Sequence, residues 1–279
     1  MFSFLCRFFE KKSIDCFAPI PLRACRIIKP YLLERAGITD GTVVVLAIPY
    51  FSRVCTNPDR NLSAYAVSKD YHGFFKSLFD ELLPALQAAF PHHRFAGFAD
   101  HSPIAEVEAA SAAGLGKIGR NHLLITPKYS SYVFLGELIT DAVIPCQVRP
   151  ISYCENCGAC KKRCPAPTIG TCLSALTQKK GILTAAEEEQ ILAYRSVWGC
   201  DICQEVCLHT KMAIQNGSIF SPIPYFEEQT LPHLTVQALR DMSEEDFEKR
   251  AYSWRGRTVI ERNLKLFEQN EGKGDIKPC

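Results

Sequence analysis

The sequence lacks a strong excess of charge of either sign. Its 279 residues include 32 lysines and arginines against 30 aspartates and glutamates, a formal net charge of +2. So small a net charge produces no global field that would attract a polyanion, and any contact with nucleic acid must depend on a local patch. The sequence offers two candidate basic patches, and each is at least as well explained by an ordinary solvated face as by contact with nucleic acid. They are Lys161, Lys162 and Arg163 in one place, and Arg255, Arg257 and Arg262 in another.

Long hydrophobic runs are also missing. No uninterrupted apolar stretch approaches the ~18 residues that a helix needs to span a bilayer, so we expect no membrane segment. The opening MFSFLCRFFEKK is apolar and aromatic, but it is short, has no positively charged n-region and is followed by no small-residue cleavage site. We therefore expect a cytoplasmic protein.

The chain has no low-complexity segment, and its only internal repetition is a pair of cysteine-rich halves. Its hydrophobic content of 47% and charged content of 22% are ordinary for a folded protein with a sizeable core. At 279 residues the chain is near the upper limit for one hydrophobic core, which favours two domains. The composition changes to a cysteine-rich loop near residues 148–151, where we place a domain boundary.

Hydrophobic periodicity predicts strands alternating with helices before that boundary. The run TVVVLAI, residues 42–48, is typical of a strand buried on both faces in the interior of a sheet. Apolar residues recur at helical spacing from about residue 63 to residue 90, where we expect Pro84 to kink or split the helix. Strands separated by helices indicate an α/β layer. Further strands are predicted at residues 94–99, 122–125 and 131–135.

Four further helical segments are predicted. Residues 31–36 form a short one, and Ser102 with Pro103 resembles a capped helix start that ends before Gly114. Residues 185–196 form another, and residues 243–269 are predicted to form a charged amphipathic helical tail.

The fourteen cysteines carry the strongest chemical signal. Four of them, in YCENCGACKKRCP (residues 153–165), follow the C-x2-C-x2-C-x3-C-P spacing, in which a short loop gives three thiolates to one iron-sulfur cube and the fourth to a neighbouring cube. Structural zinc usually takes C-x2-C pairs separated by a longer span, and disulfide frameworks are typical of secreted chains. The spacing therefore predicts two 4Fe-4S clusters, with zinc and disulfides as the alternatives.

A second cysteine-rich half, Cys172 with GCDICQEVC, completes the first half through the swapped fourth ligand. We assign cluster one to Cys154, Cys157, Cys160 and Cys207, and cluster two to Cys172, Cys200, Cys203 and Cys164. The other cysteines are expected to be free thiols: Cys6, Cys16, Cys25, Cys55, Cys146 and Cys279.

Two other motifs leave alternatives open. GLGKIG, residues 114–119, matches a dinucleotide-binding fingerprint by letter, but a predicted helix precedes it and a strand follows, the reverse of the required order. We favour a glycine loop whose backbone amides approach another planar or anionic cofactor. Asp100 follows a predicted strand and precedes a helix, so local sequence alone favours a cap that interacts with the helix dipole. His72 is expected to be an ordinary core or surface residue.

Several motifs together resemble the epoxyqueuosine reductase family. They are AYAVSKDYH (64–72), ADHSPIAE (99–106), AGLGKIGRNHLLI (113–125), YVFLGELITD (132–141) and WGCDICQEVC (198–207), which occur with the cysteine motif in the family's order and at similar spacings. The resemblance continues more weakly through SEEDFEKRAYSWRGRTVIERNL. Each motif apart from the cysteines is weak alone, whereas the set is specific.

The resemblance implies an α/β fold, α+β overall. It implies a cobalamin-binding domain at residues 1–148, a ferredoxin-like domain with two 4Fe-4S clusters at residues 149–215, and a helical segment at residues 216–279. The implied activity is cytoplasmic reduction of epoxyqueuosine to queuosine in tRNA, with cobalamin and both clusters as cofactors. The implied partners are the tRNA substrate and an external electron donor such as a flavodoxin or ferredoxin. We expect a monomer, and a short member without C-terminal helical repeats.

The resemblance also implies roles for single residues. Asp100 corresponds to the family's proton donor, and two positions depart from the family pattern, with Lys117 in place of tryptophan and Leu208 in place of proline. The residues in segments that line the family's corrinoid site are Tyr65, Asp100, Arg120, Leu124, Leu135, Ser174 and Asp201.

Two other functions stay open at this point. The first is a ferredoxin-like electron-transfer protein whose upstream domain only docks a partner. The second is a corrinoid-dependent reductase of a small molecule, similar to the reductive dehalogenases.

Overall fold

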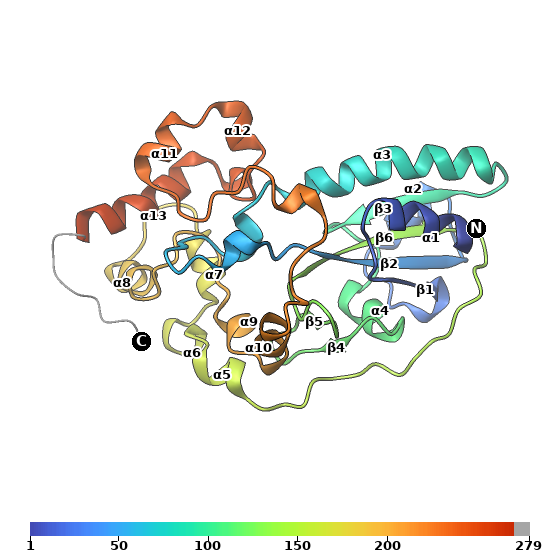
Figure 1. Cartoon of the computed structure of the whole chain (residues 1–279), viewed down its shortest axis with the longest axis horizontal. Helices are drawn as coiled ribbons and strands as arrows, with labels where there is room; N and C mark the ends of the chain where they lie inside the picture. The colour runs from blue at the N-terminus through green and yellow to red at the C-terminus, as the bar shows by residue number, and fades with distance from the viewer. Residues whose placement is uncertain (271–279) are drawn as a thin grey trace. The chain divides into compact units, whose positions relative to one another are not determined.

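The computed structural model describes residues 1–270, and its contacts divide the chain into two compact units (Figure 1). Unit 1 comprises residues 1–51, 71–158 and 207–224, and unit 2 comprises residues 52–70, 159–206 and the described residues from 225 onward. Each unit therefore combines segments far apart in the sequence. The mixture of helices and strands confirms the expected α/β class. The expected domain limits at residues 148 and 215 stay a prediction.

Unit 1 is built on a four-stranded sheet with the strand order β1-β2-β6-β3, in which all neighbours pair antiparallel. The strand predicted at residues 42–48 is β2, which is central and buried along its whole length, as expected. The sheet strands are β1 (Phe17–Pro21), β2 (Thr42–Pro49), β3 (Phe95–Ala99) and β6 (Val133–Thr140). A separate two-stranded ladder contains β4 (Lys117–Ile118) and β5 (Leu124–Ile125).

The pairing of β2 with β6 sets which side chains share a face of the sheet. These two strands pair over their full length, with Val45 opposite Glu137 and Ala47 opposite Leu135. Successive side chains of a strand point to opposite faces. Leu135, Glu137 and Ile139 therefore share one face, where Leu135 and Ile139 pack in the same hydrophobic cluster as the α4 alanines.

The helices of unit 1 cover both faces of this sheet. Figure 1 shows α3 along one face and α4 on the other, in agreement with the contacts of α3 with β3 and of α4 with β2 and β6. The N-terminal α1 is amphipathic and buries Leu5 and Phe9. The helices are α1 (Phe2–Lys11), α2 (Pro30–Ala36), α3 (Tyr71–Ala89), α4 (Glu106–Ala112) and α10 (Leu208–Gln215), with a 3₁₀ turn, η1 (Leu22–Ala24).

Two predicted helices of unit 1 differ from those observed. The helix predicted from residue 63 begins only at Tyr71, and it continues through Pro84 without a split. Leu82 and Leu86 on either side of this proline are fully buried, and their packing compensates for the lost backbone hydrogen bond. The helix predicted from Pro103 begins at Glu106, because Ser102 Oγ instead accepts the N–H of Ile104 in a local turn.

Unit 2 consists of short helices around a small apolar core. Leu173, Leu176, Ile191 and Leu266 contribute to that core. Its helices are α5 (Ala159–Arg163), α6 (Ala166–Ile169), α7 (Leu173–Thr177), α8 (Ala185–Ala193), α9 (Ile202–Glu205), α11 (Val236–Asp241), α12 (Glu244–Glu248) and α13 (Arg257–Asn270). Its 3₁₀ turns are η2 (Arg53–Thr56), η3 (Ala64–Ala66) and η5 (Ser253–Arg255), while η4 (Pro224–Phe226) lies at the change of unit.

The tail predicted at residues 243–269 is confirmed as helical, although it is not one continuous helix. The segment divides into α12, η5 and α13, because Gly256 adopts a backbone φ of 86° that no α-helix contains. None of the helices within residues 1–270 is both long and apolar enough to cross a bilayer.

Two glycines allow α3 to lie close against the sheet. A Cβ atom placed on Gly136 in β6 would lie 2.3 Å from Phe75 Cε1, and one placed on Gly97 in β3 would lie 2.4 Å from Phe79 Cγ. Real Cβ atoms do not approach carbon so closely, so the two phenylalanine rings occupy space that any other residue would fill. The absence of side chains at these positions therefore sets the spacing between helix and sheet.

We expect Gly136→Ala to lower the free energy of unfolding by about 1–3 kcal/mol, the usual cost of overpacking a core. The measurement is urea denaturation of the variant beside the wild type. Because the clash is with one ring, Phe75→Leu should cost less in the Gly136→Ala background than in the wild type. Strictly additive losses in the double variant would contradict this explanation.

Candidate functional site

A cavity of about 190 Å³ in unit 1 opens beside Asp100. Leu124 and Leu135, two of the predicted cofactor-lining residues, line it together with Asp100 and Glu106. Its remaining wall is largely apolar and includes Val107, Val133 and Phe134. Pockets for whole small molecules usually have volumes of about 300–1,000 Å³, so this cavity encloses only one part of a ligand of that size.

Asp100 is presented by the turn that follows β3. Its backbone has a φ of 62°, in the left-handed region that few residues other than glycine adopt, and its side chain is 70% exposed. His72 Nε2 at the start of α3 lies 3.8 Å from Asp100 Oδ2. The alternative that Asp100 caps a helix is wrong, because α4 begins at Glu106 and Ala105 is its N-cap residue. Its carboxyl is therefore available to a ligand.

Two carboxyl groups meet behind this cavity. Glu137 of β6 is fully buried, and Glu106 of α4 lines the cavity and interacts with both Glu137 and the backbone N–H of Asp100. Burial and the neighbouring Glu106 raise the pKa of Glu137 well above the usual value for a carboxyl, and burial also raises the pKa of Glu106. At least one of the two carboxyls therefore keeps its proton at neutral pH.

Arg120 lies elsewhere in unit 1. Its Nη1 donates a hydrogen bond to Asn156 Oδ1, inside the loop that carries Cys154 and Cys157. Asn156 itself has a left-handed backbone with a φ of 55°. Among the predicted cofactor-lining residues of unit 1, Arg120 is thus the one that contacts the cysteine loop and not the cavity.

Several backbone amides of the glycine loop at residues 114–119 donate hydrogen bonds within the protein. The N–H of Leu115 donates to Ala110 O, that of Ile118 to Ser152 O and that of Gly119 to Leu123 O. Gly116 is needed for close packing, since a Cβ there would lie 2.3 Å from the carbonyl oxygen of Ile125. These three amides are therefore engaged within the protein, and the approach of the loop's other amides to a cofactor stays a prediction.

In unit 1 the first cysteine loop is held beside the helix that follows Cys207. The N–H of Cys154 donates to Ile118 O at 3.0 Å. Glu155, the next residue, accepts hydrogen bonds from Lys117 Nζ and from His209 Nε2, the latter at 2.7 Å. His209 lies in α10, whose N-cap residue is Cys207. Glu155 thus links the loop of two predicted cluster-one ligands to the helix of a third.

Both departures from the family pattern have structural explanations. Lys117 pairs with Glu155 and so connects β4 to the cysteine loop. Leu208 is the first residue of α10, a position that suits proline but does not require it. Cys207 before it has a φ of −67° and a ψ of 133°, nearly the same as Cys172, the N-cap residue of α7.

In unit 2 the predicted cluster-two ligands come from neighbouring helices. Cys164 directly follows α5, one turn after the cluster-one ligand Cys160, and its N–H donates to Cys160 O. Helix α5 packs against α9, which carries Cys203. Burial raises the pKa of the Cys200 thiol to about 12, and the neighbouring Cys203 and Cys172 add to the rise. Cys172, Cys200 and Cys203 are therefore close enough to interact.

The donor chemistry of these residues fits iron-sulfur clusters. No two cysteines in the described part of the chain are joined by a disulfide. Within residues 1–270, no three histidine, cysteine, aspartate or glutamate side chains are arranged to hold one metal ion. Four thiolates about 2.3 Å from a single zinc ion would lie about 3.8 Å apart. A four-iron cube holds its thiolates farther apart, at its corners, and cysteine is the ligand that such cubes take.

Tyr65 and Ser174 come together in unit 2. Gln178 Nε2 donates to the Tyr65 hydroxyl at 3.3 Å and to Ser174 Oγ at 3.1 Å. Burial raises the pKa of Tyr65, so its hydroxyl stays protonated. Gly199 makes this approach possible, because a Cβ there would lie 2.8 Å from Tyr65 Cε1 and its φ is 77°.

Asp201 is fully occupied with protein contacts. Its buried carboxylate accepts hydrogen bonds from Arg60 Nη1 at 2.7 Å, the backbone N–H of Ala64 at 2.7 Å, Ser63 Oγ and Gln204 Nε2. These bonds hold the segment before η3 against the N-terminus of α9. Asp201 therefore orders the segment that contains Tyr65, which is why residues 63–70 do not continue α3.

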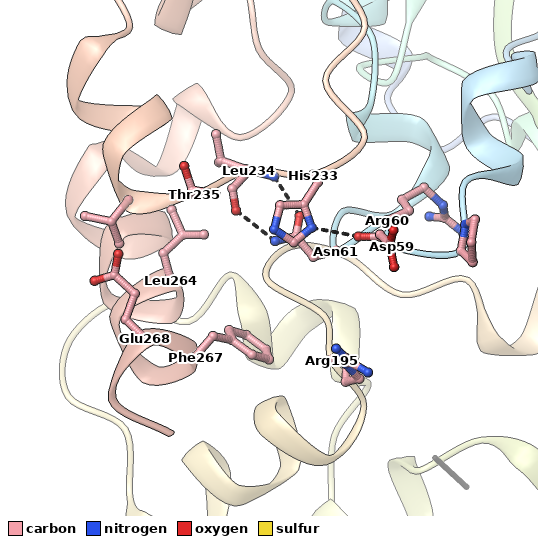
Figure 2. Close-up of a pocket in the computed structure, with 12 residues that line it drawn as sticks. Asp59, Arg60, Asn61, Arg195, His233, Leu234, Thr235, Leu264, Phe267 and Glu268 are labelled. Carbon is pink, nitrogen blue, oxygen red and sulfur yellow. Dashed lines mark hydrogen bonds between the residues drawn. The ribbon is translucent and has the colours of Figure 1, made fainter. Parts of the chain in front are cut away.

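A second cavity, of about 250 Å³, lies in unit 2 (Figure 2). Its polar groups largely satisfy one another: the Asn61 side chain bonds both the N–H and the carbonyl oxygen of Leu234, and His233 Nδ1 donates to Asp59 O at 2.7 Å. No predicted site residue lines it. This cavity is larger, it lies where the 59–61 segment meets the segment before α11, and no cysteine lines it.

Sequence reasoning assigned no role to Glu106, Glu137 or His72. A signal for Glu137 was present, because it is the one charged residue in the apolar run of β6. Its partner could not be identified, since α4 and β6 are adjacent only in the folded chain. His72 was interpreted as an ordinary residue because its proximity to Asp100 depends on the packing of α3 on the sheet.

Comparison with known proteins agrees with the motifs. The chain is 30% identical to the epoxyqueuosine reductase of Lactococcus garvieae over 84% of its own length and 70% of the relative's. It is 32% identical to that of Listeria monocytogenes, over 98% of the chain and 76% of the relative. The chain is also similar to a crystal structure of epoxyqueuosine reductase with a tRNA-Tyr stem loop modified with epoxyqueuosine. The match covers 95% of this chain and 80% of the chain in that structure, with a TM-score of 0.75 and 24% sequence identity.

No protein-family model matches the chain. The solved structure has the same fold as this chain. The two curated relatives are 30% and 32% identical to the chain, over most of its length and most of theirs. Together with the order of the motifs, these similarities are sufficient to assign the family. The chain is an oxidoreductase that belongs to the epoxyqueuosine reductase family.

Proposed function

We propose that this chain reduces epoxyqueuosine to queuosine in tRNA, using cobalamin and two 4Fe-4S clusters. The observation that carries the proposal is the cavity of unit 1, where Asp100 shares one apolar wall with Leu124 and Leu135. A carboxyl beside such a wall suits a reaction in which an oxygen leaves and must be protonated. Both curated relatives are named epoxyqueuosine reductase, and one related structure contains RNA modified with epoxyqueuosine.

The two clusters are proposed to be bound as assigned above, cluster one by Cys154, Cys157, Cys160 and Cys207, and cluster two by Cys172, Cys200, Cys203 and Cys164. Iron-sulfur clusters transfer single electrons. The reaction needs electrons from outside the chain, and we propose a flavodoxin or ferredoxin as their source. Cytoplasmic location and a monomeric state are part of the same proposal.

The residues proposed to contact cobalamin are Tyr65, Asp100, Arg120, Leu124, Leu135, Ser174 and Asp201. Leucine side chains fit the apolar face of a corrin ring, and the Tyr65–Ser174–Gln178 group offers neutral donors for its amide side chains. Asp201 acts by ordering Tyr65, since its own oxygens are occupied. When bound, the corrin supplies a low-valent cobalt that is a strong nucleophile.

Asp100 is proposed to deliver a proton to the oxygen that leaves the substrate. Its exposed carboxyl lies at the cavity, and His72 can hold the carboxyl in position through the contact of 3.8 Å. The apolar wall around Leu124 and Leu135 limits the access of water to the reacting group. A pure electron carrier would have no use for an acid at an apolar cavity, and this disfavours the electron-transfer alternative.

We expect anaerobic reconstitution to incorporate about eight irons and eight sulfides per chain, four of each per cube. Cys164→Ala should damage cluster two and leave cluster one, because the cross-ligation assigns Cys164 to the second cube. Iron and sulfide analysis with electron paramagnetic resonance measures both effects. Cys146→Ala is the control, since that thiol belongs to neither set. About four irons per chain, or stoichiometric zinc, would contradict the assignment.

We expect Asp100→Asn to lower turnover by ~10² to 10⁴, the usual contribution of general acid catalysis. Asparagine keeps the shape of the side chain but has no acidic proton. The measurement is steady-state reduction of epoxyqueuosine-containing RNA by the reconstituted variant and wild type, with cofactor content determined in both. Wild-type turnover by the variant would show that the proton comes from another group. A loaded wild type that binds both cofactors but leaves the RNA unchanged would favour a small-molecule substrate.

A further inference from the structure

The proposed reaction consumes more protons than Asp100 carries. When an epoxide becomes an alkene, both C–O bonds break, a C=C bond forms and the oxygen leaves as water. The balance requires two electrons, which the external one-electron donor supplies through the clusters, and two protons. Asp100 can deliver one of them in a turnover. The inference below therefore depends on the proposed function and concerns the source of the second proton.

Glu106 and Glu137 form a carboxyl pair directly behind the cavity. Glu137 is 0% exposed, and within residues 1–270 neither of its oxygens has a hydrogen-bond partner of good geometry. Oε1 of Glu106 is also buried and without a partner in the described chain. Glu137 pairs in register with Val45 on one side and Phe98 on the other, so its surroundings on the sheet are apolar.

The charges around the pair do not neutralise it. In the described chain no lysine or arginine forms an ion pair with either carboxyl, although Lys29 lies near enough to favour ionisation of Glu106. Asp100 opposes that ionisation. Cys25 is a further titratable group nearby. Burial and the neighbouring Glu137 raise the pKa of its thiol to about 12. Two carboxylates that face each other in an apolar site cannot both be charged, so the pair retains a proton.

We propose that Glu106 and Glu137 store the second proton of the reaction, and that Glu106 delivers it into the cavity. Glu106 is the member of the pair that lines the cavity with Asp100, whereas Glu137 keeps the proton on the pair from within the sheet. In the step, the O–H bond of Glu106 breaks and an O–H bond of the departing water forms. The carboxylate left behind takes a proton from solvent before the next turnover.

The stored proton can be detected without cofactors through the pH dependence of stability. A carboxyl whose folded pKa is raised contributes stability below its unfolded pKa and loses it as the pH rises toward the folded value. Glutamine at position 137 cannot ionise. The Tm of Glu137→Gln relative to wild type should therefore increase from about pH 5 to about pH 8.

Glu108→Gln is the matched control for this measurement. Glu108 lies on α4, the helix of Glu106, and pairs at the surface with Arg26, which lowers the pKa of the Glu108 carboxyl. The Tm of this control relative to wild type should therefore not increase as the pH rises. Infrared spectra of the wild type at neutral pH should show the carbonyl stretch of a protonated, buried carboxyl, and Glu137→Gln should weaken it. A Tm difference independent of pH, with no such band in the wild type, would overturn the stored proton.

Turnover of the loaded enzyme tests delivery. Glu106→Gln should lower kcat at least about 10-fold with little change in KM, because the proton and not the substrate contact is lost. Glu137→Gln leaves one carboxyl to hold the proton, and Glu106 then loses it once the pH exceeds its own pKa, which burial raises. The kcat of this variant should therefore fall increasingly as the pH rises. Glu106→Asp should retain more activity than Glu106→Gln, because aspartate keeps an acidic proton. A purely structural role of Glu106 would not predict this difference.

The outcomes separate this inference from the proposed function. If the loaded wild type reduces the RNA and Glu106→Gln retains its kcat at every pH, the second proton comes from elsewhere and the inference fails alone. If the loaded wild type does not reduce the RNA, the proposed function fails, and with it the use of the proton. The stability and infrared measurements on the cofactor-free chain still show whether the pair holds one.

Discussion

Unit 1 depends on the full-length antiparallel pairing of β2 with β6. This register puts Glu137 on the face covered by α4, where it meets Glu106, and puts Gly136 on the opposite face beneath Phe75. A slip of one residue would exchange the faces. It would move a carboxyl under the phenylalanine rings of α3 and leave Glu106 without its neighbour. Both the packing of the core and the chemistry of the cavity thus depend on one set of backbone hydrogen bonds.

Unit 2 depends in a similar way on the buried carboxylate of Asp201. It accepts hydrogen bonds from Arg60, Ser63 and Ala64 of one segment, and it belongs to the N-cap residue of α9 in another. Removing one partner of such a buried pair usually costs about 3–5 kcal/mol, since the other charge remains buried and unpaired. The contacts place Tyr65 beside Ser174 and keep α9, with Cys203, in its position. Asp201, which was predicted to line a cofactor site, is thus engaged with protein partners and orders its neighbours.

The sequence predicted elements well where local pattern and tertiary environment agree. The run at residues 42–48 is apolar throughout, and the strand there is buried throughout. Predictions failed where a distant contact overrides local preference. Residues 63–70 have helical periodicity, but the Asp201 carboxylate binds the N–H of Ala64, and Gly256 interrupts a segment whose periodicity continues on both sides. Ser102 and Pro103 looked like a helix start, yet the serine hydroxyl is used in a turn.

The sequence by itself determined the family, and it predicted the thiolate ligands, because cluster loops bring their cysteines together over a few residues and their spacing is visible in the sequence. It also located Asp100, although not its role, since a cap and an acid have the same local pattern. Only the tertiary structure decided that Asp100 is not a cap, that Arg120 contacts the cysteine loop, and that Glu106 and Glu137 share a site. The physical reason is that a carboxyl's protonation depends on burial and on its neighbours in space, and the two glutamates lie on a helix and a strand that are brought together only by the packing of α4 on the sheet.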